Sequence, residues 1–452
     1  MGKKLKLVFS ALILGLCFCV LLCTVLLPKA PLRGNETAVP APRIMLGGKL
    51  NTAFLDELTD WYAQRFAFRS EAITMDSLVL SGVFRTSNTN EVIVGKDGWL
   101  YYSSTADDYC NEQRLTDREI GNIAITLSLL EEAAITQDAR FIFVPAPNKS
   151  TVYPEYMPDS YKVLPREGDL ERLYTALDRE NVTHTTLSSL FAASDEILYH
   201  KTDSHWNNLG AAMASHEILQ LLGLKCEDLS AQPYTLREDF PGDLAAMLYP
   251  AISVPESQQV FDLSGLTESG ASEDVLYETA CETGTGTLYC WRDSFGNALS
   301  PLLAVNFREA VFSRAAAVDL TAAAEINAGF VIWEIAERNI GNITLSAPVF
   351  EAPVREMELP ADRTDTAVTA SVSGADGLLR VSGSFDPASV DAGSRIYAVI
   401  GGTVFEATPA GGNDGSFTLF LPENASPDSL SLILTESEIP VLTAPIQLSP
   451  AE

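Results

Sequence analysis

The sequence predicts an α/β fold, in which a parallel sheet carries helices on both faces, with a C-terminal all-β sandwich and an N-terminal membrane anchor helix. Three observations predict this architecture. Helix-like and strand-like segments alternate between residues 116 and 337, short alternating segments follow residue 360, and a long uncharged run lies at the N-terminus. With 452 residues, of which 46% are hydrophobic, the chain can fill two or three folded domains.

The N-terminal run, Leu7–Leu27, has 21 residues without a charge and follows three lysines. It is long enough to cross a membrane, and prolines rather than a small-residue cleavage site follow it. We therefore expect an uncleaved signal-anchor over residues 1–27, with a cleaved signal peptide as the alternative. Because positive residues stay on the cytoplasmic side, the rest of the chain is expected outside the cytoplasm. Residues 28–43, rich in proline and small residues, predict an extended linker.

The α/β domain is expected over residues 44–350. Apolar residues at helical spacing predict helices, and short apolar runs bounded by Gly or Pro predict strands. In chain order, the expected helices are 51–69, 116–137, 170–180, 209–222 and 295–304. The expected strands are a hairpin in 92–102 and the segments 140–147, 182–187, 287–291, 310–313 and 329–337. Thr116 and Glu119 have the spacing of a capping box, which predicts the start of the second helix.

The β-sandwich domain is expected over residues 360–452. Its segments alternate apolar and polar residues, lack a helical period, and are separated by Gly, Asp, Asn and Pro, which is typical of short strands joined by turns. The segments that predict strands are 378–385, 394–402, 402–407, 415–422 and 430–436.

The charge of the chain excludes one class of partner. From residue 34 onward there are 25 basic and 60 acidic residues, a net charge of −35. A surface this acidic repels phosphate backbones, so we expect no nucleic-acid partner. The sequence also has no Cys/His cluster at metal-ligand spacing, so neither a metal site nor a cofactor is expected.

Four cysteines lie beyond the predicted anchor, an even number with three possible pairings: Cys110, Cys226, Cys281 and Cys290. Cys281 and Cys290 flank the Gly-rich segment GTGTG, which favours a disulfide across a hairpin. Cys110 and Cys226 would then form the second pair.

His205 is the strongest candidate for a general base among the four histidines. It lies in KTDSHWNNLGAA, two residues after Asp203, so the carboxylate can orient the imidazole and stabilise its protonated form. Asn207 or Asn208 would cap the helix that follows. The alternative is an ordinary helix-cap loop, and the other histidines are expected in the core or on the surface.

Ser294 lies in CWRDSFGNAL, directly after the predicted strand 287–291 and before the helix 295–304. At such a turn the hydroxyl is exposed, and backbone N–H groups at the start of the helix can receive a developing oxyanion. Serine needs a base to act as a nucleophile, and His205 could supply it. An ordinary helix cap is again the alternative.

Together these motifs resemble the SGNH-hydrolase-like O-acetyltransferases of the alginate O-acetylation type and the related DHHW family. The resemblance rests on the DxHW loop, DSFGNAL and the strand VIWEIAERNI. Further matches are WYAQRFAFR, VGKDGWLYY, PAPNKSTVYPEYMP and FPGDLAAML. They occur in a consistent order over about residues 50–345.

The resemblance implies that Ser294 is the nucleophile, His205 the base and Asp203 the carboxylate that orients it. Asp and His precede Ser in the chain, which is the order of this family. The sequence departs from the family pattern at two positions: Arg292 replaces the Gly of the esterase GDS pattern, and Ser204 replaces the second His of DHHW. Neither change removes a catalytic atom.

Four further residues follow predicted sheet strands and are expected to help bind the oxyanion or the substrate: Asn148, Lys149, Tyr153 and Arg338. A structural role for each is the alternative.

The resemblance implies a membrane-anchored, extracytoplasmic O-acetyltransferase that moves an acetyl group through a serine ester to hydroxyls of a cell-surface or secreted polysaccharide. A multi-span membrane acyltransferase would supply the acetyl group. Two alternatives remain open, a secreted carbohydrate acetyl esterase and a non-catalytic polysaccharide-binding or assembly protein. The aromatic residues of the predicted sandwich mostly alternate as core residues should, which does not favour the last.

Overall fold

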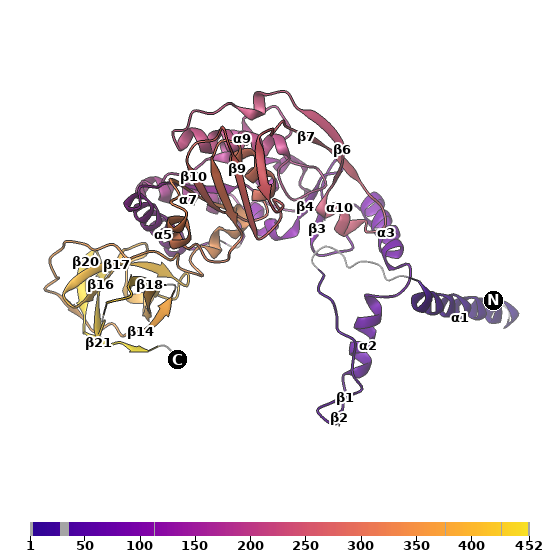
Figure 1. Ribbon diagram of the computed structural model, residues 1–452. Coiled ribbons are helices and arrows are strands. Elements are labelled where there is room, and N and C mark those ends of the chain that lie inside the picture. The colour runs from indigo at the N-terminus through magenta and orange to yellow at the C-terminus, as the bar shows by residue number, and fades with distance from the viewer. Residues whose placement is uncertain (1–2, 28–35, 113, 376, 426, 451–452) are drawn as a thin grey trace.

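The structure is a computed structural model that describes residues 3–27, 36–112, 114–375, 377–425 and 427–450. An N-terminal helix, an α/β unit and a C-terminal β unit follow one another along the chain (Figure 1). Part of the predicted linker, residues 28–35, lies outside the described residues.

A six-stranded sheet forms the centre of the α/β unit. Its order is β5 (Arg140–Ala146), β12 (Phe330–Ala336), β10 (Thr287–Trp291), β11 (Glu309–Ser313), β9 (Leu276–Cys281) and β8 (Leu266–Ser269). The first four strands run parallel, whereas β9 and β8 run antiparallel at one edge. The predicted α/β sheet is confirmed, with the difference that β9 runs opposite to the other five strands, so the two pairings at this edge are antiparallel.

Helices cover both faces of this sheet, as predicted. One face carries α5 (Asp117–Thr136), α7 (Asp169–Glu180) and α12 (Leu320–Glu325), and the other carries α9 (Asn208–Leu221) and α11 (Gly296–Ala304). Successive side chains of a strand point to opposite faces. In β5, Phe141 and Phe143 therefore join the core under α5, while Ile142 and Val144 join the core under α9.

Short elements connect these layers. They are the hairpin β3 (Val92–Val94) and β4 (Leu100–Tyr102), the helices α4 (Ala106–Cys110), α6 (Lys149–Val152), α8 (Leu187–Ala192) and α10 (Asp243–Leu248), and the strands β6 (Thr235–Pro241) and β7 (Pro255–Val260). The predicted capping box also forms, because the Thr116 N–H donates to the Glu119 carboxylate at 2.7 Å and the Glu119 N–H to Thr116 Oγ1 at 3.2 Å.

Two predicted elements differ in the structure. The expected strand 182–187 pairs with β5 through a single bridge between Phe143 and His184, because α8 begins at Leu187 and ends the extended segment. The expected helix 51–69 is broken into α2 (Phe54–Ala63) and α3 (Arg69–Val79). Phe68 lies between them with φ 64°, a left-handed conformation that no helix can continue through.

The C-terminal β unit is one curled, mainly antiparallel sheet rather than two separate sheets. Its strands are β13 (Arg363–Thr364), β14 (Val368–Ala375), β15 (Leu378–Phe385), β16 (Ile396–Ile400), β17 (Thr403–Ala410), β18 (Ser416–Pro422), β19 (Ser429–Glu436), β20 (Ile439–Thr443), β21 (Ile446–Gln447) and β22 (Ser449–Pro450). The long strand β17 pairs with β16 through its first half and with β18 through its last three residues, so it joins the two halves that enclose the core. The predicted all-β character is confirmed.

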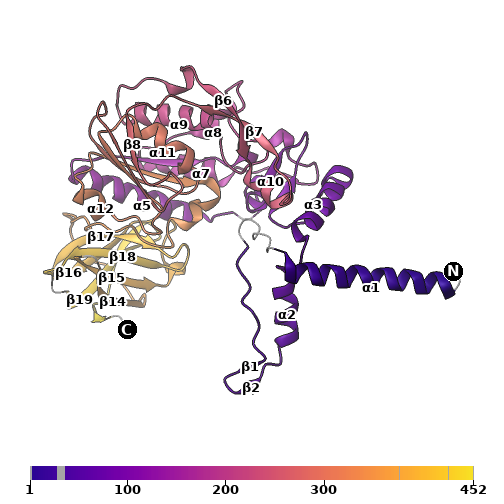
Figure 2. The same ribbon diagram turned by 45° about the vertical axis from the view of Figure 1, so that its right-hand side comes forward.

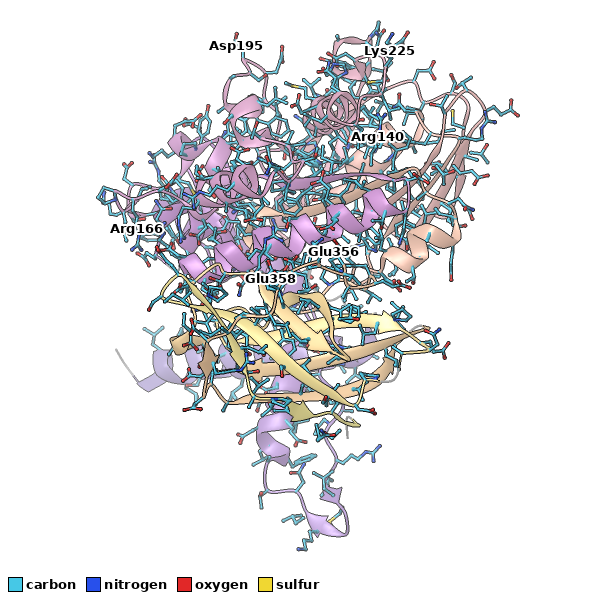
Figure 3. The ribbon with its side chains drawn as sticks, turned by 90° about the vertical axis from the view of Figure 1, so that its left-hand side faces the viewer. Arg140, Arg166, Asp195, Lys225, Glu356 and Glu358 are labelled. Atoms are coloured by element: carbon cyan, nitrogen blue, oxygen red, sulfur yellow. The ribbon has the colours of Figure 1, made fainter. Side chains whose placement is uncertain are left out.

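A buried acid holds the β unit against the α/β unit, where α5 lies along the curled sheet (Figure 3). Glu406, which is 2% exposed, accepts from Arg355 at 2.6 Å and from Arg395 at 2.5 Å. Arg355 also pairs with Glu132 of α5 at 2.5 Å, and Arg395 pairs with Glu180 of α7. One acid therefore connects two arginines, each of which reaches a helix of the other unit.

The predicted disulfide between Cys281 and Cys290 does not form, and the four cysteines outside the N-terminal helix are free. The reason is the strand order. β9, which ends at Cys281, and β10, which carries Cys290, are not neighbours, because β11 lies between them. The two strands are therefore separated by two strand spacings of about 4.8 Å each. This separation is larger than the distance between Cα atoms that a disulfide can join. The pairing of Cys110 with Cys226 is likewise absent.

The N-terminal helix α1 (Lys3–Leu26) contains the apolar segment Leu7–Leu26, which is long enough to cross a membrane and of which no residue is buried. Signal sequences share this length and composition, so the helix alone does not distinguish an anchor from a signal sequence. Figures 1 and 2 show it extending away from the folded units.

We expect Glu406→Gln to lower the free energy of unfolding by about 1–3 kcal/mol, because it removes the charge that both buried arginine contacts share. The matched control is Asp159→Asn, which removes the partner of Lys96 from a pair whose carboxylate is 88% exposed. Exposed pairs contribute about 0–1 kcal/mol. Urea unfolding of both variants measures the difference, and equal stabilities would contradict the role given to Glu406.

Candidate active site

The site lies at the carboxyl edge of the parallel strands, where two loops meet. Ser294 follows β10 in the turn that leads into α11. Asp203 and His205 lie in the loop before α9, whose start is capped by the Asn207 side chain, which accepts the Gly210 N–H at 2.9 Å. This cap is one of the two predicted, and it fixes where the loop ends and the helix begins.

Ser294, His205 and Asp203 form one continuous chain of hydrogen bonds. His205 Nε2 lies 2.8 Å from Ser294 Oγ, and His205 Nδ1 lies 2.7 Å from Asp203 Oδ1. Since an ionised carboxylate only accepts, the proton belongs on Nδ1, which leaves the Nε2 lone pair facing the serine hydroxyl. The geometry is that of a nucleophile, a base and an orienting carboxylate.

The electrostatics of the pair favour a charged imidazole. Burial raises the pKa of Asp203, but the hydrogen bonds that it accepts from His205 and from the Asp243 backbone hold that pKa well below its usual range. Burial lowers the pKa of His205, and the hydrogen bond and charge of Asp203 outweigh it, so the pKa of His205 lies above its ordinary value. A base that becomes positive in the reaction is stabilised by this arrangement.

A buried lysine holds the loop that carries Asp203. Lys149 is 3% exposed and donates from Nζ to the carbonyl oxygens of Asp203 at 2.6 Å and of His200 and Lys201 at 3.1 Å each. Burial lowers its pKa to about 8. The ammonium is directed at backbone carbonyls of the loop, which indicates the structural role rather than the expected contact with substrate.

Asp243, in the segment FPGDLAAML, contributes a second carboxylate. The Asp243 N–H donates to Asp203 Oδ2 at 2.8 Å, and the Asp243 carboxylate accepts from the Ser204 N–H at 2.7 Å and from Ser204 Oγ at 2.5 Å. Its Oδ2 lies 3.7 Å from His205 Nδ1. Gly242 allows this approach, because a Cβ there would lie 2.4 Å from the Thr202 carbonyl oxygen. Ser204 thus links Asp243 to the loop that carries His205, whose Nδ1 lies 3.2 Å from Ser204 Oγ.

Asp203, His205 and Asp243 also offer ligand atoms that all lie within 4.8 Å of one another, the spacing of a metal site. Their hydrogen bonds argue for a different use. The Asp203 carboxylate accepts from the His205 N–H at 2.9 Å and the Asp243 N–H, in addition to the imidazole. The Asp243 carboxylate accepts from Ser204. Donors of the protein therefore take three of the roughly four acceptor sites of each carboxylate.

Asp293 fixes the turn that carries Ser294. Its Oδ1 accepts the Phe295 N–H at 2.9 Å, and its Oδ2 accepts the Ala336 N–H at 2.9 Å. Its own N–H donates at 3.1 Å to the buried Glu334, whose pKa burial raises well above the usual range. The turn that carries Ser294 is thereby joined to the end of β12, the neighbouring strand.

The other predicted residues lie around this site in structural contacts. Asn148 donates from its side chain to Asp108 at 2.9 Å and from its backbone to the buried Glu337 at 2.7 Å, and Glu337 has a pKa that burial raises to about 8. The Tyr153 hydroxyl accepts the Leu198 N–H at 2.7 Å.

Of the predicted binding residues, Arg338 lies over the ring of Phe295, the residue after Ser294. Its guanidinium carbon is 5.4 Å from the centre of the Phe295 ring, and the same ring is 4.9 Å from that of His205. Arg338 also opposes the positive charge of His205 and so lowers its pKa. Together with Asp108 and Glu337, Arg338 lines a cavity of about 450 Å³, which is separate from the cleft beside Ser294.

The cleft beside Ser294 has a volume of about 600 Å³. Its lining combines aromatic and polar side chains: Trp206, Phe240, Phe261, Phe295, Asn208, Arg237, Gln258, Glu273 and Asn297. Such a mixture suits a ligand that presents both apolar faces and hydroxyl groups.

A family model described as the SGNH hydrolase-like domain of the acetyltransferase AlgX matches residues 92–281. This part of the chain is similar to that SGNH hydrolase-like acetyltransferase domain. The match contains Asp203 and His205 and ends shortly before Ser294. A relative from Pseudomonas syringae pv. tomato, the probable alginate O-acetylase AlgJ, is 26% identical over 130 residues, which cover 28% of this chain and 32% of the relative. The chain thus spans about a third of that protein.

Solved structures of two other proteins are similar to part of this chain. Bacillus cereus PatB1 has a TM-score of 0.45 at 15% identity, covering 55% of this chain and 96% of its own. A DHHW family protein from Eubacterium siraeum has a TM-score of 0.42 at 16% identity, covering 56% of this chain and 93% of its own.

We expect Asp243→Asn to move the acid limb of the pH–rate profile downward by about one pH unit, because it removes a negative charge that raises the pKa of His205. The limb marks the pH below which His205 is protonated and cannot accept a proton. Ester hydrolysis measured against pH tests this, with Asp239→Asn, an exposed acid paired only with Arg237 among the described ion pairs, as control. An unchanged acid limb in Asp243→Asn would contradict the assignment.

We expect Lys149→Met to lower kcat about 10²-fold while KM stays nearly constant, since the loop carbonyls lose their donor and the carboxylate moves. Lys201→Met, which changes an exposed lysine of the same loop, is the control. Steady-state kinetics with a chromogenic ester separate the two constants. A rise in KM alone would instead favour the substrate-binding role that the sequence suggests.

Proposed function

We propose that this protein is an extracytoplasmic O-acetyltransferase that transfers an acetyl group through an ester of Ser294 to hydroxyls of a cell-surface or secreted polysaccharide. The observation that carries the proposal is the hydrogen-bonded chain from Ser294 through His205 to Asp203, in a protein similar to the AlgX acetyltransferase domain. The proposal assigns Ser294 as the nucleophile, His205 as the base and Asp203 as the carboxylate that orients it.

In the first half-reaction, Ser294 Oγ attacks the carbonyl carbon of the acetyl donor and its proton passes to His205 Nε2. Asp203 stabilises the imidazolium that results. The tetrahedral oxyanion is received by the Ser294 N–H and by the Asn297 amide, whose Oδ1 is occupied by Arg292 at 2.5 Å. Collapse of the intermediate returns the proton to the leaving group and forms acetyl-Ser294.

In the second half-reaction, a sugar hydroxyl enters the cleft and gives its proton to His205 Nε2 as its oxygen attacks the acetyl carbon. The bond from the acetyl carbon to Ser294 Oγ breaks, and the proton passes to the serine. Water in place of the sugar would make the protein an esterase. Transfer is favoured because the family model is that of an acetyltransferase and the cleft lining suits a sugar ring.

The N-terminal helix supports a location at the membrane. As an uncleaved anchor, α1 would hold the α/β unit outside the cytoplasm, beside a multi-span membrane acyltransferase that exports the acetyl group. The three lysines at the start of the chain favour that orientation.

We expect Ser294→Ala to reduce turnover of a chromogenic acetyl ester by the full-length protein about 10³-fold or more, and His205→Ala and Asp203→Ala to reduce it similarly, because the three act as a unit. Ser272→Ala, which changes another serine that lines the cleft, is the matched control. Undiminished turnover in folded Ser294→Ala would contradict the assignment.

The fate of the acetyl group distinguishes the alternatives. Mass spectrometry of a sugar oligomer incubated with donor and enzyme is expected to show acetyl on the oligomer. Free acetate without acetylated oligomer would favour the esterase, and binding of the oligomer without any turnover would favour a non-catalytic binding protein.

A further inference from the structure

In the helix α3 and the helical turn η1 (Leu80–Phe84) that continues it, the apolar side faces solvent and the polar side is buried, which is the reverse of an ordinary surface helix. Apolar side chains recur along one side and are exposed to solvent: Phe68, Met75, Leu78, Val79, Val83 and Phe84. Met75 is 68% and Val83 71% exposed. Met75, Leu78, Val79 and Val83 are three, four and eight positions apart, which places them on one side of the helix. Together with Phe68 and Phe84 at its two ends, they form what we call the α3 apolar face.

The opposite side of the same helix is buried, and it is polar. Ser70, Thr74 and Ser77 are at most 8% exposed. Thr74 Oγ1 accepts the Ala251 N–H at 2.9 Å, and Ser81 Oγ lies 2.8 Å from the Tyr249 hydroxyl. Hydroxyl groups therefore attach the helix to the segment after α10, while the apolar residues are directed outward. In water, a helix that packs on its own domain has the reverse arrangement.

The α3 apolar face begins where α1 ends. The Ala67 N–H, just before α3, donates to Thr24 Oγ1 of α1 at 2.9 Å. A cavity of about 390 Å³ lies at this junction, lined by Thr24 and Leu27 on one side and by Phe68 and Pro250 on the other. In both Figures 1 and 2, α3 lies on the side of the α/β unit from which α1 extends away, and α10 lies between α3 and the rest of the unit.

We infer that the α3 apolar face lies in the boundary between headgroups and acyl chains of the bilayer that α1 crosses. The inference rests on the proposed anchor. Lipid is the occupant that the observations favour, because the face is continuous with the end of a helix whose apolar segment is itself unburied. A helix with one apolar side and one polar side lies in the plane of the interface in this way.

Charged residues border the face, among them the exposed Glu71 near its start, which lines the cavity at the end of α1. Asp76, between the two sides of the helix, accepts from Asn88 at 3.1 Å. Arg85, exposed and directly after Phe84, ends the segment with a cation that anionic headgroups attract. The polar side stays with the protein, so no unpaired hydroxyl is carried into lipid.

Two attachments would fix the orientation of the catalytic unit. A single spanning helix leaves the unit free to turn about the helix axis and to tilt. A second, interfacial helix packed directly on the α/β unit removes that freedom and presents the Ser294 cleft at a constant height and direction relative to a donor in the membrane.

Photo-crosslinking of the full-length protein tests this. Benzoylphenylalanine is placed at Met75 or Val83, the protein is reconstituted in phosphatidylethanolamine and phosphatidylglycerol vesicles, and adducts are identified by mass spectrometry. Leu14 of α1 is the positive control, and Val275, which is 69% exposed and precedes β9, is the matched control. We expect lipid adducts at Met75 and Val83 in yields within about threefold of Leu14, and less than a tenth of that yield at Val275.

Lipid adducts at Leu14 without adducts at Met75 and Val83 would overturn the inference and leave the anchor intact. Predominant adducts to a second copy of the chain would also overturn it, in favour of a protein interface. Absence of lipid adducts at Leu14 would overturn the anchor and this inference together. Turnover of a chromogenic ester in the same vesicles reports the catalytic unit separately, so a failure there is distinguishable from a failure of the membrane contact.

Discussion

The pairing of the Asp203 carboxylate with the His205 imidazole is the interaction on which the rest of the site depends. It sets the tautomer that faces Ser294, and it raises the pKa of His205 against the effect of burial. Two hydrogen bonds to Asp203 hold the pair in place: Lys149 Nζ donates to its backbone carbonyl oxygen, and the Asp243 N–H donates to its carboxylate.

Buried ionisable groups gather at the carboxyl edge of the sheet, and each has a local task. Asp293 and Glu334 join the turn that carries Ser294 to β12, while Glu337 receives the backbone that leads from β5 into α6. Parallel strands bring all of these loops to one edge, which is why residues distant in sequence converge there. Rigidity of this kind favours a mechanism in which the groups are already placed before the substrate binds.

The sequence was informative where chemistry depends on neighbours along the chain. Asp203 and His205 are two residues apart, and Ser294 sits between a clear strand and a clear helix, so the motifs could be read directly. The disulfide prediction was wrong because the crossover through β11 separates two strands that are adjacent in sequence. The contribution of Asp243 depends on a contact across 40 residues, although its GDL motif was visible, and that of Lys149 depends on backbone carbonyls, which no side-chain pattern reveals.

Trapping the acetyl-enzyme tests the central claim most directly. The full-length protein is mixed rapidly with an activated acetyl ester, quenched in acid and digested, and the peptide containing Ser294 is examined by mass spectrometry. We predict one acetyl group on Ser294 in the parent protein, which disappears when a sugar oligomer is added, and none in His205→Ala under the same conditions. Acetylation at another residue, or turnover of the ester with Ser294 unmodified at every time point, would contradict the account.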